Sequence, residues 1–188
     1  MKFTAVLYLA LASSVAAMPT EDLSKRQTVN RGQDTLVFKE QGGVPGNECL
    51  TFRNNGNFQH RAKNLVPRSN MLLGEIVNAA CVNTAADRQI TPSTRNGQDV
   101  LLVQRSFSNG FRPDLVNKEA CVGFNGTAFR AEDCASRNIE FVAQQGNNLV
   151  AANGACLNGH DAKAQVTVSE QGQNCAEFTT TSVTPTNP

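Results

Sequence analysis

Aromatic residues with a polar edge are almost missing from this chain. Its 188 residues include no Trp, one Tyr and ten Phe. Tyr and Trp provide many of the hot spots of protein interfaces and the flat surfaces on which sugars stack. The composition therefore disfavours recognition of sugars or nucleobases by aromatic stacking.

Imidazoles and an excess of one charge are also scarce. The chain has two His, His60 and His160, and its 17 basic and 16 acidic residues give a net charge of +1. Nucleic acids and anionic membranes are bound by basic surfaces, so we expect neither as a partner. The sequence has no C-x-x-C or HExxH spacing, P-loop or Rossmann glycine pattern, and we therefore predict no metal and no cofactor.

The N-terminal segment is typical of a secreted precursor. Residues 1–17 combine Lys2, an apolar stretch and small residues up to Ala17, as in a signal peptide. Residues 18–26 end in Lys25-Arg26, which resembles the dibasic processing site of secreted fungal precursors. The predicted mature protein, residues 27–188, has 188 − 26 = 162 residues with 14 bases and 14 acids, and it lacks Tyr8.

Six cysteines lie in this mature part: Cys49, Cys81, Cys121, Cys134, Cys156 and Cys175. An even number of cysteines in a secreted chain favours disulfides over metal ligation. The closest pair is 134 − 121 = 13 residues apart, which is unlike a zinc motif. We therefore expect three disulfides in an extracellular protein.

Internal similarity indicates a duplication. Gly32-Gln33-Asp34 recurs as Gly97-Gln98-Asp99, and Ala-Cys followed by an aliphatic residue recurs near residues 81, 121 and 156. These matches predict two tandem half-repeats, about 30–94 and 95–178, followed by a short polar tail. Two disulfide schemes remain open: 49–81, 121–156 and 134–175 if the half-repeats are equivalent, or 49–81, 121–134 and 156–175 if each loop closes locally.

The expected fold class is all-β. Apolar segments such as Leu36 to Phe38, Val100 to Val103 and Ile139 to Val142 are short, and Asn-Gly or Gln-Gly turns separate them. Gly and Asn together make up 34 of the 162 mature residues, which leaves little room for long helices. We predict a single compact, disulfide-bonded domain, either a barrel or a β-trefoil-like fold with internal repeats, and a monomer.

The C-terminal 70 residues resemble the repeats of ricin-B-type β-trefoil lectins. The resemblance rests on Ile139-Glu140-Phe141-Val142, Leu149-Val150 and Asn153-Gly154-Ala155-Cys156-Leu157-Asn158, with a similar end at 171–178. In that family the residue after Cys-Leu helps to hold a sugar. The resemblance would place this role at Asn83, Gly123 and Asn158.

Several residues are candidates for a functional site. His160 next to Asp161 is the nearest approach to a general base with a carboxylate, and His60 could serve as its partner in a small hydrolase. Glu132-Asp133 is a second carboxylate pair. Phe107 and Phe111 flank a loop that we expect either to contact a partner or to pack over the end of the fold.

Asn125-Gly126-Thr127 matches the acceptor motif for N-glycosylation, which marks an exposed loop in a secreted chain. Together with the leader and cysteines, it resembles the organisation of small secreted cysteine-rich fungal proteins, which include effectors, elicitors and wall-associated proteins. This resemblance implies a non-enzymatic virulence or cell-wall protein that binds a host or wall protein or glycan. A lectin-like glycan-binding module and a small hydrolase using His60 and His160 are the alternatives.

Overall fold

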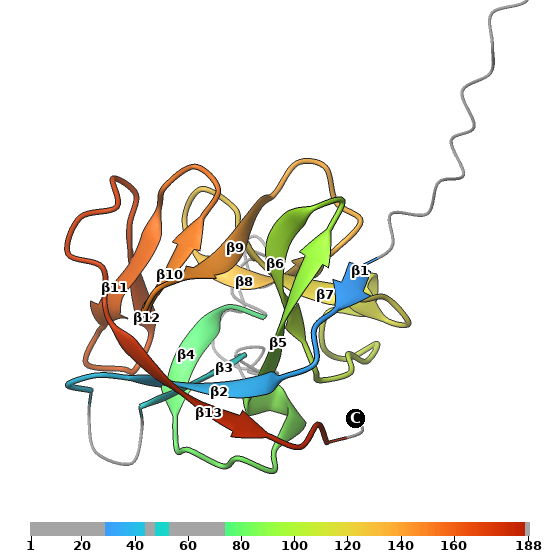
Figure 1. Cartoon of the computed structure of the whole chain (residues 1–188), viewed down its shortest axis with the longest axis horizontal. Coiled ribbons are helices and arrows are strands. Elements are labelled where there is room, and N and C mark those ends of the chain that lie inside the picture. The colour runs from blue at the N-terminus through green and yellow to red at the C-terminus, as the bar shows by residue number, and fades with distance from the viewer. Residues whose placement is uncertain (1–28, 44–47, 53–73, 187–188) are drawn as a thin grey trace, which may run out of the picture.

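The fold is built almost entirely from short β-strands (Figure 1). The computed structural model describes residues 29–43, 48–52 and 74–186. Within these ranges the strands are β1 (Val29–Arg31), β2 (Thr35–Glu40), β3 (Cys49–Phe52), β4 (Ile76–Ala79), β5 (Gln89–Arg95), β6 (Gln98–Val103), β7 (Ala120–Phe124), β8 (Phe129–Asp133), β9 (Glu140–Gln145), β10 (Asn148–Ala151), β11 (Cys156–His160), β12 (Val166–Ser169) and β13 (Phe178–Val183). Two single-turn 3₁₀ helices, η2 (Ala86–Arg88) and η3 (Pro113–Leu115), accompany them. The predicted all-β class is confirmed.

Tight turns connect several neighbouring strands. Arg95 pairs with Gln98, so Asn96 and Gly97 form a two-residue turn between β5 and β6. Both turn residues have positive φ, 51° and 80°, as a type I′ hairpin turn requires. The Asn-Gly signal in the sequence therefore positions one hairpin correctly.

All strand pairs are antiparallel. Neighbouring strands follow the order β12-β11-β10-β9-β7-β6-β5-β2-β3-β4, while β1 pairs with β5, β8 with β7 and β13 with β2. In Figure 1 the orange and red strands β10 to β12 lie on the left and the green strands β5 and β6 on the right. The last strand of the chain thus lies along the blue strand β2, near the start of the fold.

The sheet is open, so the prediction of a closed barrel is wrong. The end strands β4 and β12 meet at a single bridge between Val77 and Gln165, supported by the Asn78 N to Ala164 O hydrogen bond of 2.8 Å. The register of β11 and β12 shifts between Leu157 and Gly159, and Gly159 has a φ of 126°. Such a bulge, here in β11, locally disrupts the ladder between β11 and β12 and bends the bulged strand.

Aliphatic and Phe side chains fill one main core. Phe38, Leu101, Val122, Leu149 and Leu157 are each at most 1% exposed. Phe124 and Phe129 pack edge to face with ring centroids 5.2 Å apart, at the end of the β7–β8 hairpin next to its turn. A smaller cluster comprises Val100, Leu102, Cys121, Cys134 and Phe141.

The three disulfides match the second of the two predicted schemes, in which each bridge closes a local loop. Cys49 bonds to Cys81, Cys121 to Cys134 and Cys156 to Cys175. The alternative pairs 121–156 and 134–175 are therefore excluded. Register explains the second bridge, because Ala120 pairs with Asp133 and brings the adjacent Cys121 and Cys134 within 5.0 Å at their Cα atoms.

Across the part of the chain that the structure describes, no helix is long and apolar enough to cross a membrane.

Candidate functional site

An open cleft with both polar and apolar lining residues lies where β1, the β5–β6 hairpin and the β9–β10 turn meet. Its volume is about 620 Å³, within the usual range for small-molecule sites. The β1–β5 pairing and the two-residue β5–β6 turn bring distant parts of the chain to this place. The lining residues are Asn30, Arg31, Gly32, Pro92, Ser93, Thr94, Asp99, Val100, Leu101, Gln144 and Gly146.

Strand register aligns three polar residues across this cleft. Asn30 of β1 pairs with Thr94 of β5, and Thr94 pairs with Asp99 of β6. Directly paired residues point to the same face of a sheet, so an amide, a hydroxyl and a carboxylate form one row. Pro92 and Leu101 form the next pair on this face. Leu101 is 1% exposed and belongs to the main core, so the polar row lies beside the edge of the core.

Arg31 belongs to a different hydrogen-bond network. Arg31 pairs with Ser93, and its guanidinium donates to Gln104 Oε1 at 3.2 Å. Gln104 is 5% exposed and donates through Nε2 to Thr91 Oγ1, which lies 2.7 Å from Thr35 Oγ1. Arg31 is thus tied to a buried polar network on the face opposite to the row of Asn30, Thr94 and Asp99.

A second polar cluster surrounds His160. Its Nδ1 lies 3.1 and 3.0 Å from the two carboxylate oxygens of Glu40, and Asn78 Nδ2 donates to Glu40 as well. A carboxylate offers hydrogen-bond acceptors, so Nδ1 is suited to act as the donor in this contact. The three residues come from β2, β4 and β11, so this cluster joins distant strands.

Asp161, the sequence neighbour of His160, has a different role. Asp161 Oδ1 accepts hydrogen bonds from Lys163 N at 2.8 Å and Gln165 N at 2.9 Å. These bonds shape the turn from β11 to β12. The carboxylate that contacts His160 is therefore Glu40, which lies 120 residues away and was not identified from the sequence.

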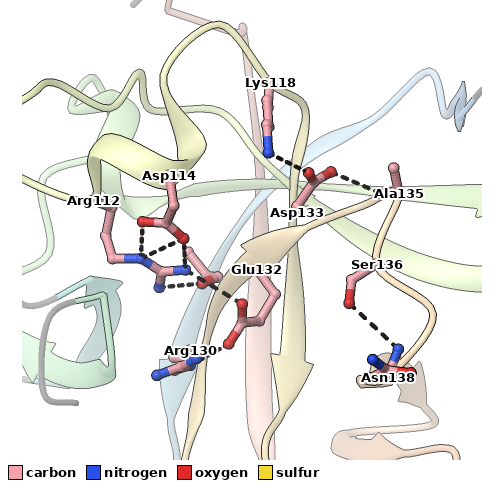
Figure 2. A network of polar contacts seen from close by, with 10 residues as sticks. Arg112, Asp114, Lys118, Arg130, Glu132, Asp133, Ala135, Ser136 and Asn138 are labelled. Carbon is pink, nitrogen blue, oxygen red and sulfur yellow. Dashed lines mark hydrogen bonds and ion pairs between the residues drawn. The ribbon is translucent and has the colours of Figure 1, made fainter. Parts of the chain in front are cut away.

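The other carboxylate pair, Glu132 and Asp133, contributes to an ion-pair network (Figure 2). Glu132 contacts Arg130 and Arg112, whereas Asp133 contacts Lys118 at 2.8 Å. Figure 2 shows the two carboxylates pointing toward different partners. These residues therefore fasten β8 and the η3 turn to their neighbours instead of facing a common substrate.

Arg112 is the centre of this network. It is 5% exposed, has a φ of 54°, and donates to Asp114, Glu132 and the Ala131 carbonyl. Burial opposes its charge, but the hydrogen bond to Asp114 and the negative charges of Asp114 and Glu132 outweigh burial and raise the pKa of Arg112. A left-handed backbone is unfavourable for Arg, and these contacts hold it there.

The pKa values of Asp114 and Asp133 shift in the opposite direction, downwards. The hydrogen bond from Arg112 lowers the pKa of Asp114 below its ordinary value. Burial alone would raise the pKa of Asp133, but hydrogen bonds from Lys118 and the Ala135 N–H, with the charges of Lys118 and Arg95, leave it lowered. Both carboxylates therefore stay ionised in moderately acidic solution.

Phe107 and Phe111 are buried rather than presented to solvent. Their rings stack with centroids 5.6 Å apart, and they are 9% and 4% exposed. The Arg105 guanidinium lies 4.4 Å from the centroid of Phe111. The sequence left open whether this loop contacts a partner or packs over the end of the fold. The burial of both rings favours packing.

The remaining candidates are dispersed. Asn158 is exposed on β11, Asn83 is exposed between β4 and η2, and Gly123 is buried in β7. Asn125 lies at the tip of the β7–β8 hairpin, where its Oδ1 accepts from Thr127 N and Ala128 N. His60, Ala17, Lys25 and Arg26 lie outside the described residues.

Sequence reasoning identified His160 but not its partners in the cluster, Glu40 and Asn78, and it missed the cleft. The Asn96-Gly97 turn signal was enough to bring Thr94 and Asp99 together, but the pairing of β1 with β5 joins residues about 60 positions apart. Glu40 and Asn78 carry no local motif. Comparison with protein-family models, curated proteins and solved structures gave no match.

Proposed function

We propose that this chain is a secreted, non-enzymatic interaction protein of effector or elicitor type that acts at the fungal cell wall or a host surface. The observation that carries the proposal is the cleft with its row of polar residues, which three separate parts of the chain build on a disulfide-bonded β scaffold. Rigid sheets that present a concave polar site are suited to binding.

The three disulfides are consistent with an extracellular protein, because such bonds persist in oxidising compartments. The predicted signal peptide and the acceptor motif at Asn125 agree with this environment. We therefore place the action of the protein outside the producing cell.

The principal alternative is a glycan-binding module. The row of Asn30, Thr94 and Asp99 favours it, since amides, hydroxyls and carboxylates are the groups that hydrogen-bond sugar hydroxyls. The ricin-type positions give less support because Asn83, Gly123 and Asn158 differ in exposure and none is an aspartate.

A small hydrolase is the second alternative, and the Glu40–His160 contact favours it. A carboxylate that fixes the Nδ1 tautomer leaves Nε2 of the imidazole available as a base. If His60 and His160 act together, replacing both with Ala will abolish any hydrolysis measured on wall or host polymers. Unchanged hydrolysis would remove this assignment.

We further propose that the fold consists of three related units, as in a β-trefoil. Support comes from a recurring order of four strands with one local disulfide: β2–β5 with 49–81, β6–β9 with 121–134, and β10–β13 with 156–175. The expected boundary of two half-repeats, 94/95, falls inside β5. Three units therefore describe the strand order better than two half-repeats.

A binding assay tests the proposed function. The mature protein is incubated with isolated fungal walls and with host surfaces, and the bound fraction is compared with that of Thr94→Arg. The large side chain would fill the cleft and reduce binding about tenfold or more. Thr180→Arg on exposed β13 is the matched control and should bind as the parent does. Equal binding by the parent, Thr94→Arg and Thr180→Arg would show that the cleft does not take part in binding.

A further inference from the structure

We infer that the cleft accepts a neutral or amine-bearing polyhydroxylated ligand, such as a short oligosaccharide, and discriminates against anionic ones. This inference rests on the proposed function, which uses the cleft for recognition, and adds the chemistry of the ligand. It locates recognition at the junction of β1, β5 and β6, away from the Cys-Leu positions that the ricin-type resemblance indicated.

The row of Asn30, Thr94 and Asp99 provides the hydrogen-bonding groups. Across antiparallel strands spaced by about 4.8 Å, the three residues span roughly 10 Å. That span matches the size of one or two sugar rings and offers an amide donor, a hydroxyl and a carboxylate acceptor in sequence. Gln144, near the end of β9, also lines the cleft, and its Nε2 donates to Gly146 O at 3.0 Å. Its side-chain oxygen can act as a further acceptor.

Asp99 gives this row a negative charge. Among the described residues, no Lys, Arg or His nitrogen forms an ion pair with its carboxylate. The one cationic residue of the lining, Arg31, points to the opposite face of β1, where its guanidinium donates to Gln104. The hydroxyl-binding row therefore favours a cationic amine or a neutral ligand and repels a carboxylate or sulfate.

The apolar part of the lining supports the same class of ligand. Pro92 is half-buried and lies beside the row, one same-face pair further along β5, whereas its partner Leu101 is buried and the lining contains no aromatic ring. A sugar would therefore be held by hydrogen bonds around its edge, with its C–H groups over Pro92. Binding of this kind depends on the individual polar groups, so single substitutions should have measurable effects.

Calorimetric titration of the mature protein tests the ligand class. Three probes of similar length are compared: an N-acetylated amino-sugar oligomer, the same oligomer with free amines, and a uronic-acid oligomer. We expect the first two to bind, the amine form more tightly, and the uronic acid to bind at least about tenfold more weakly. Asp99→Asn should lower affinity for the amine form about tenfold and change affinity for the N-acetylated form less.

Asp34→Asn is the matched control, because Asp34 is exposed and lies outside the cleft lining. It should leave all three affinities unchanged. Tightest binding of the uronic acid, or an equal effect of both substitutions, would overturn the inference. If no oligomer binds but Thr94→Arg still prevents attachment to walls or host surfaces, the ligand class is wrong and the proposed function stands. If no oligomer binds and Thr94→Arg attaches normally, both are wrong.

Discussion

Gln89 is a fully buried polar side chain that holds the end of the chain in place. Its Nε2 donates to the carbonyl of Asn83 at 2.7 Å and the hydroxyl of Thr186 at 3.0 Å, and its Oε1 accepts from Thr186 N at 2.8 Å. One carboxamide thus connects the start of β5, the loop after β4 and the segment beyond β13. A buried polar group with all its partners contributes to stability and to a single arrangement of the segments around it.

Replacing Gln89 with Leu should release this segment. The substitution leaves the Thr186 N–H and the Asn83 carbonyl without their partner, which costs about 1–3 kcal/mol. Urea unfolding measures the free energy, and hydrogen exchange at 184–186 should increase. Gln98→Leu, at an exposed position, is the control and should change neither.

Arg112 offers a second test at the residue scale. Arg112→Met removes a buried cation and leaves Glu132 with Arg130 alone, so we expect a loss of about 3 kcal/mol in the free energy of unfolding. Adding Glu132→Leu to this variant should restore part of the loss, because the buried carboxylate is then absent. A double variant less stable than Arg112→Met would contradict this account.

Stability should also depend on pH through Asp114 and Asp133. Their pKa values are lowered in the folded protein, so the unfolded chain binds more protons than the folded one when the pH falls below the ordinary Asp range. The contribution is present above about pH 4 and is lost as the pH falls through the lowered values. Thermal unfolding of Asp114→Asn/Asp133→Asn between pH 2 and 6 should show a weaker dependence than the parent. An identical dependence would exclude these two groups.

At the scale of elements, β1 depends on a glycine. A Cβ atom at Gly32 would lie 2.0 Å from the Pro92 carbonyl oxygen, so β1 and β5 approach each other only because residue 32 has no side chain. The same contact lies in the wall of the cleft. The approach of these strands therefore sets the shape of the candidate site.

Gly32→Ala should displace β1 and deform the cleft. We expect amide chemical-shift changes concentrated in β1 and β5 and weaker attachment to walls or host surfaces, with a stability loss of about 1–3 kcal/mol. Gly97→Ala is a poor control because of its positive φ, whereas Gly110 has open space around it and an ordinary φ. Gly110→Ala should therefore leave β1 and attachment unchanged.

The elements also show what sequence reasoning can achieve. Short apolar segments and Asn-Gly turns predicted strands and located the β5–β6 hairpin, because those signals are local. Glu40 and His160, or Asn30 and Thr94, meet only through contacts between distant parts of the chain, which no local pattern encodes. The closed barrel was predicted wrongly because closure depends on how β4 and β12, the two end strands, pair with each other, and no local sequence pattern shows this.

At the scale of the whole molecule, polar contacts join the two ends of the open sheet. Gln165 Nε2 donates to Ile76 O at 3.0 Å near the Val77–Gln165 bridge, and Glu40 binds both Asn78 and His160 nearby. These contacts connect β2 and β4 to β11 and β12 where a ladder is missing. The cluster at His160 therefore has a structural role whether or not it has a chemical one.

His160→Ala should loosen this junction. Loss of one partner of the buried Glu40 carboxylate is expected to cost about 1–3 kcal/mol and to speed hydrogen exchange in β4 and β12 before other strands. Asn158→Ala, on the exposed part of the same strand, should have little effect. Uniform acceleration in every strand would show that His160 stabilises the fold generally and does not act at the junction.

The three disulfides follow one another along the chain and do not cross. Their loops, 49–81, 121–134 and 156–175, neither overlap nor enclose one another. Each bridge can therefore form as soon as its own segment enters an oxidising compartment, in order from the N-terminus, without waiting for later residues. A protease cut between 82 and 120, for example after Arg105, would leave two pieces joined only by the fold, and they would separate on a denaturing gel without any reductant.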